Sequence, residues 1–70
     1  MTRERLVYMA NQIAHAFRLK GEARAVAETA DHLRKFWDPR MRREILAILE
    51  AGGDGLDAIA RAAVEQLRAG

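Results

Sequence analysis

The sequence predicts an all-α fold, a compact single domain of four short helices that spans residues 1–70. Three observations support this. Apolar residues recur at three- and four-residue spacing in four successive segments, no segment alternates with a period of two, and proline or glycine separates the segments. The expected helices cover residues 2–19, 22–36, 39–51 and 57–69, joined by short connections that favour antiparallel neighbours.

The sequence marks both ends of the first helix and the boundary between the second and the third. Thr2 can cap the first helix and Gly21 ends it, while Asp38 and Pro39 suit the N-cap and first turn of the third. The inward residues expected on the first helix are Leu6, Met9, Ala10, Ile13, Ala14 and Phe17. Those expected on the second are Ala23, Val26, Ala27, Ala30, Leu33 and Trp37.

The last two helices are separated by a glycine-rich turn over residues 52–55, and Asp57 can cap the fourth helix. On its polar face we expect Arg61 to pair with Glu65, four residues later. The inward residues of the third helix are Met41, Ile45, Ile48 and Leu49. Those expected for the fourth are Leu56, Ile59, Ala60, Ala63, Val64 and Leu67.

Length and composition limit what the chain can do. A domain of 70 residues without cysteine has a small core and no disulfide to support it, so we expect a partner chain or a second copy to stabilise it. A net charge of +2 gives little attraction to nucleic acid. No apolar run is long enough to cross a membrane, and helical periodicity starts without a signal peptide, which favours a cytoplasmic protein.

The sequence offers little for catalysis or metal binding. The only hydroxyl side chains belong to Thr2, Tyr8 and Thr29, and there is no serine or cysteine to act as a nucleophile. His15 and His32 fall on polar faces of different helices, and zinc requires three or four converging ligands. We therefore expect no catalytic, cofactor or metal site in this chain.

Apolar residues outside the predicted core point to a docking surface. Tyr8, Gln12, His15 and Leu19 share the far face of the first helix, and Ala25, Thr29, His32 and Phe36 share that of the second. Trp37 stands at the corner before the third helix. Its position at the end of an apolar stripe favours the core, although tryptophan is also enriched at binding sites.

A cluster of five cations surrounds this corner: Arg34, Lys35, Arg40, Arg42 and Arg43. Beside two aromatic residues, they are consistent with a small basic helical module that binds nucleic acid through the Arg34–Arg43 patch. Arginines also pair with carboxylates of protein partners. The low net charge favours a protein partner, with nucleic acid as the alternative.

Four segments resemble the delta subunit of the bacterial NAD-dependent molybdenum formate dehydrogenases. They are Leu6–Ala14 (LVYMANQIA), Ala30–Arg42 (ADHLRKFWDPRMR), Gly55–Asp57 and Ala62–Glu65. The second is the most specific, because helical periodicity alone does not select FWDPRMR. The resemblance implies a non-catalytic accessory subunit bound to the large catalytic (alpha) subunit, in support of its assembly, cofactor loading or stability.

The resemblance also implies where the cofactors of such a complex lie. The catalytic subunit holds molybdenum bis-guanine dinucleotide and iron–sulfur clusters, and the complex carries FMN and NAD, none of them bound by this chain. On the chain itself we predict one docking edge with two secondary positions, Tyr8 and His15. The edge consists of Arg34, Lys35, Phe36, Trp37, Asp38, Pro39, Arg40 and Arg42.

Overall fold

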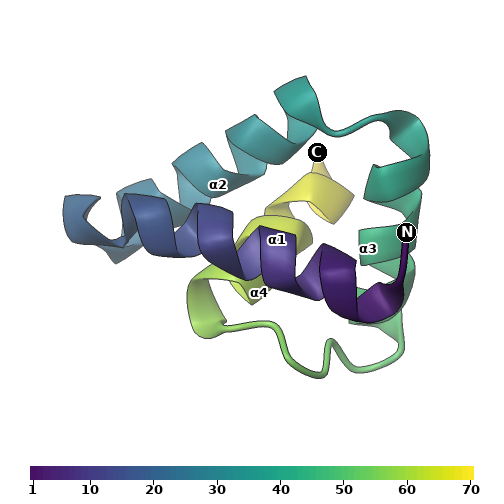
Figure 1. The fold of residues 1–70 in the computed structure, drawn as a ribbon. Coiled ribbons are helices and arrows are strands. Elements are labelled where there is room, and N and C mark those ends of the chain that lie inside the picture. Colours follow the sequence, from purple (N-terminus) through teal and green to yellow (C-terminus); the bar gives the residue numbers. More distant parts are fainter.

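The computed structural model describes residues 1–70 and contains four α-helices and no strand, which confirms the all-α prediction (Figure 1). No helix combines the length and apolar character needed to traverse a bilayer. The α-helices are α1 (Arg3–Phe17), α2 (Glu22–Phe36), α3 (Pro39–Glu50) and α4 (Ala58–Ala69). A short 3₁₀ turn, η1 (Arg18–Lys20), follows α1.

Three helices begin at the side-chain caps expected from the sequence. The side chains of Thr2, Asp38 and Asp57 each accept a hydrogen bond from the backbone N–H three residues further on. Pro39 occupies the first turn of α3, where its missing N–H leaves no helical bond unmade. These starts are therefore fixed locally, before any packing between helices.

Helices α1 and α2 form an antiparallel hairpin that is closed at η1 and opens toward α3 (Figure 1). Helix α3 lies at the open end, and α4 packs against α2 in the most extensive contact between two helices. All four helices contribute to one core. Its buried members are Leu6, Val7, Ala10, Ala14, Leu33, Trp37, Ile45, Ile48, Leu49, Leu56, Ala60 and Val64.

The connection between α3 and α4 covers residues 51–57 and is longer than the sequence suggested. Leu56, expected on α4, is buried from within this connection. The predicted Arg61–Glu65 pair is wrong. Arg61 instead donates to the carbonyl of Gly53 at 3.0 Å and so fastens the connection to α4.

The buried face of α2 also differs from the prediction. Ala23 and Ala27 are exposed, whereas Ala25 and Thr29 are fully buried. The reason is the way α2 turns toward α1: His32, one turn beyond Thr29, contacts Phe17 of α1. Small side chains therefore occupy the buried face of α2, and the Thr29 hydroxyl is enclosed there with no hydrogen-bond partner.

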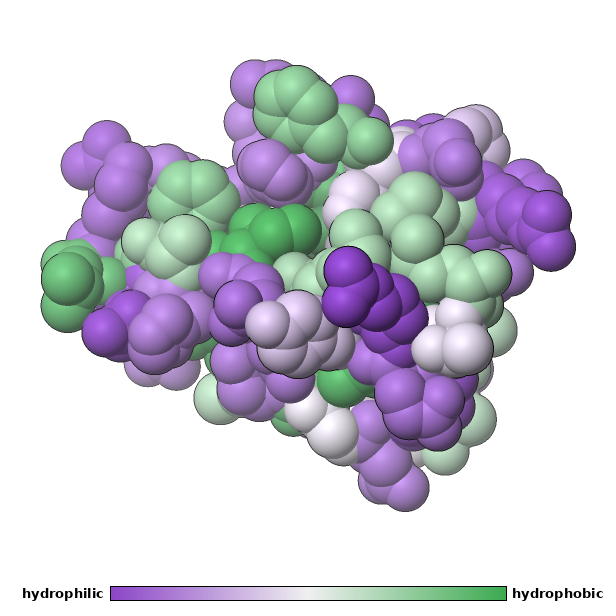
Figure 2. All heavy atoms as spheres, in the orientation of Figure 1, coloured by the Kyte–Doolittle hydropathy of each residue, from purple (hydrophilic) through white to green (hydrophobic).

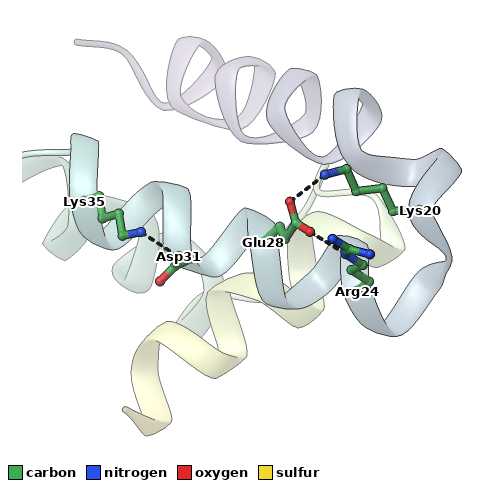
Figure 3. Close-up of polar contacts among 5 residues, drawn as sticks. All are labelled: Lys20, Arg24, Glu28, Asp31 and Lys35. Carbon is green, nitrogen blue, oxygen red and sulfur yellow. Dashed lines mark hydrogen bonds and ion pairs between the residues drawn. The ribbon is translucent and has the colours of Figure 1, made fainter.

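An ion-pair network fastens the closed end of the hairpin (Figure 3). Lys20 Nζ lies 3.0 Å from one carboxylate oxygen of Glu28, and Arg24 Nε lies 2.7 Å from the other. Hydrogen bonds from Arg24 and then Lys20 lower the pKa of Glu28 below its usual 4.5. Because Lys20 belongs to η1, Glu28 joins the turn to the middle of α2.

We predict that Glu28→Gln lowers the stability of the chain above pH 4.5 and leaves it unchanged at strongly acidic pH. A carboxyl group with a lowered folded-state pKa stabilises the fold above its unfolded pKa, and this contribution disappears as the pH falls through the folded value. Urea unfolding between pH 3 and 7 measures it. As a control, the same substitution should have no effect in a Lys20→Gln/Arg24→Gln background; an equal effect there would contradict the account.

Candidate functional site

Two arginines of the predicted docking edge are engaged inside the molecule. The Arg42 guanidinium donates to the carbonyls of Trp37 and Arg34 at the end of α2. Arg34 in turn donates to the carbonyl of Gln66 near the end of α4, at 3.2 Å. The last carbonyls of a helix have no partners within it, so Arg42 satisfies groups that would otherwise need water. The Gln66 carbonyl also accepts from the Gly70 N–H, so the bond from Arg34 is a second one that joins α2 to the end of α4. Both have a structural role.

Two further cations of the edge are paired with acidic residues of their own helix. Lys35 lies 3.0 Å from Asp31, and Arg40 lies 3.5 Å from Glu44. Among the five cations, Arg43 alone makes no ion pair or side-chain hydrogen bond within the chain. The edge therefore presents less free positive charge than its sequence suggests, and this weakens the nucleic-acid alternative.

The corner residues are structural as well. Trp37 is only 4% exposed and belongs to the core, as its place on the apolar stripe indicated. Asp38 accepts a hydrogen bond from the Met41 N–H, and Pro39 forms the first turn of α3. The expectation that the Trp37 ring is exposed on the docking edge is thus corrected, because the ring is buried in the core to which all four helices contribute.

An apolar groove of about 420 Å³ opens beside this corner, in the divergent part of the α1–α2 hairpin. Figure 2 shows apolar residues gathered between α1 and the C-terminal half of α2 and extending toward α3. No charged side chain lines it. The lining residues are Tyr8, Met9, Gln12, Ile13, His32, Phe36, Trp37 and Met41.

Exposed aromatic rings form the rims of this groove. Phe36 is 71% exposed and Tyr8 is 54% exposed. The Phe36 ring lies 4.7 Å from the His32 ring, and the Tyr8 hydroxyl accepts a hydrogen bond from Gln12 at 3.2 Å. The Arg5 guanidinium lies 5.7 Å from the centre of the Tyr8 ring. Large apolar surfaces thus face solvent beside a free cation.

The groove brings together Tyr8, Phe36 and Trp37 from the predicted site, but His15 does not line it. Sequence reasoning missed Met9 and Met41, which it assigned wholly to the core. Both are half-buried and face the groove as well as the core cluster. The sequence indicated this side as a surface through other lining residues that it placed on the far faces: Tyr8, Gln12, His32 and Phe36.

The donor atoms of the chain do not fit a metal or cluster site. No three histidine, cysteine, aspartate or glutamate side chains converge, and the sequence has no cysteine to ligate iron–sulfur clusters. His32 lies between the rings of Phe17 and Phe36, and His15 lies on a different helix.

The fold and the groove define a small all-α domain with an exposed surface suited to contact with another macromolecule. A family model described as NADH-dependent formate dehydrogenase delta subunit FdsD matches residues 5–64. The chain therefore belongs to this family of delta subunits, as the resemblance indicated. No curated protein and no solved structure matches the chain significantly.

The hydrogen bonds of Arg42, on the predicted docking edge, lead to a prediction about stability. We expect Arg42→Gln to lower the free energy of unfolding by about 1–3 kcal/mol, because it leaves carbonyls at the end of α2 without a charged donor. The matched change Arg43→Gln removes the same charge from a side chain without such contacts and should cost less than about 0.5 kcal/mol. Urea unfolding followed by circular dichroism compares them, and equal losses would contradict a capping role for Arg42.

Proposed function

We propose that this chain is a non-catalytic accessory subunit of a cytoplasmic NAD-dependent molybdenum formate dehydrogenase. It binds the large catalytic (alpha) subunit and supports its assembly, cofactor loading or stability. Membership of the delta-subunit family supports the assignment to a formate dehydrogenase complex. The exposed groove is the observation that carries the proposal that the chain binds another subunit. A chain of this size with aromatic rings in water gains stability when a partner covers them.

The polar groups of the chain support a non-catalytic role. Thr2 caps α1, Thr29 is enclosed in the core, and the Tyr8 hydroxyl at the rim bonds to the side-chain amide of Gln12. A nucleophile needs a positioned base, and the imidazole in the groove, His32, packs beside Phe17 and Phe36 and makes no side-chain hydrogen bond to a hydroxyl or a carboxylate. Formate oxidation is therefore assigned to the partner.

We also assign the cofactors to the rest of the complex. Molybdenum bis-guanine dinucleotide, iron–sulfur clusters, FMN and NAD require thiolates, metal ligands or phosphate-binding loops, and the donor set of this chain fits none of these. The contribution of the chain to cofactor loading is then indirect. It would hold the catalytic subunit in a conformation that accepts or retains its cofactors.

Purification of the enzyme from cells with and without this chain tests the proposal. We expect the chain to co-purify with the catalytic subunit, and the enzyme lacking it to contain less molybdenum or to lose formate-dependent NAD reduction faster on storage. Co-expression of the chain should restore both properties. Equal metal content, activity and lifetime in the two preparations would contradict the proposal.

A further inference from the structure

We infer that the groove receives an amphipathic α-helix of the catalytic subunit, with an apolar face in the groove and a carboxylate beside Arg5. This inference rests on the proposed function and adds the kind of segment that docks. The surface concerned is the groove between α1, α2 and α3, and not the docking edge predicted from the sequence, where Arg34 and Arg42 bond to carbonyls of this chain and Arg40 pairs with Glu44.

The walls of the groove favour a helix over an extended segment. Apart from Trp37 at the C-cap of α2, the lining residues belong to α-helices, where backbone N–H and C=O groups are bonded within the helix or to a capping side chain. The Trp37 carbonyl accepts from Arg42. An extended segment would find no backbone partners there and would lose those of water. A helix satisfies its own backbone groups and presents only side chains, as in other helix-in-groove complexes.

The dimensions of the groove suit two to three helical turns. It shares His32 and Phe36 with a smaller hollow that continues to Phe17 at the closed end of the hairpin. From Tyr8 to Phe17, α1 rises about 14 Å, at ~1.5 Å per residue. A docked helix of ten residues or so would cover this length. The flexible side chains of Met9 and Met41 in the lining can adapt to its apolar residues.

Charge indicates which partner helix fits. The residues that line the groove itself carry no carboxylate, and Arg5, which lies against the Tyr8 rim, has no acidic partner in the chain. The smaller hollow toward Phe17 does contain Glu28 and Asp31, but both are paired with cations of this chain. A carboxylate on the incoming helix would pair with Arg5. A second copy of this chain fits less well. In a two-fold dimer centred on the groove, the same surface faces itself, so Arg5 of each copy would meet a groove without carboxylates.

Two exposed apolar residues allow a matched test with the catalytic subunit itself as the probe. Phe36 forms a rim of the groove, while Leu19, 87% exposed, lies at the closed tip of the hairpin outside it. We expect Phe36→Asp to raise the dissociation constant for the catalytic subunit at least about tenfold and Leu19→Asp to change it less than about twofold. Circular dichroism confirms that both variants fold.

The charge requirement has its own pair of variants. Arg5→Glu should weaken binding and reduce its dependence on salt, whereas Arg18→Glu, which alters a side chain at the end of α1 outside the groove, should not. A photo-crosslinking benzoyl group on the ring of residue 36 identifies the segment that docks. We expect a helical peptide of the catalytic subunit that contains acidic residues.

The outcomes separate the inference from the proposed function. If the wild-type chain does not bind the catalytic subunit, the proposed function fails and the inference falls with it. If the wild type binds but Phe36→Asp binds equally well, or the crosslink reaches a segment that is not an acidic helix, the inference alone is overturned. Sedimentation that shows a dimer dissociated by Phe36→Asp would also overturn it, in favour of a second copy.

Discussion

The fully buried residues of the α1–α2 hairpin are small near η1 and larger toward its open end. Ala14, Ala25 and Thr29 are buried in the half of the hairpin nearer its closed end, whereas Leu33 and Trp37 are buried toward the open end. Because side-chain size sets the distance between packed helices, this increase in side-chain size accompanies the divergence of the α1–α2 hairpin away from η1 (Figure 1). The network of Glu28 holds its closed end, and the groove occupies the opening.

The open end of the hairpin is completed by the corner between α2 and α3. Trp37 fills the core below the groove, and Arg42 satisfies carbonyls at the end of α2, so the corner keeps one geometry. The same geometry leaves Phe36 in water, one residue before the buried tryptophan. A chain with so small a core cannot bury every aromatic ring, and those left over define the surface that a partner can cover.

The sequence predicted the four helices and their caps because periodicity and Asp38–Pro39 act locally. It placed Tyr8 and Phe36 outside the core correctly. It failed for Ala25 and Thr29, because the rotation of α2 depends on α1, which no local pattern specifies. It also read the arginines as free charges. Their contacts with carbonyls of Arg34, Trp37 and Gln66 arise only when the helix ends come together.

Methionine methyl resonances of the labelled chain, followed on addition of the catalytic subunit, test the central claim most directly. The chain has three methionines: Met9 and Met41 line the groove, and Met1 lies in a separate hollow between α1 and α3. A partner helix in the groove predicts that the Met9 and Met41 methyl signals shift while that of Met1 remains. A shift of Met1 alone, or binding that leaves both groove methyls unchanged, would contradict the account.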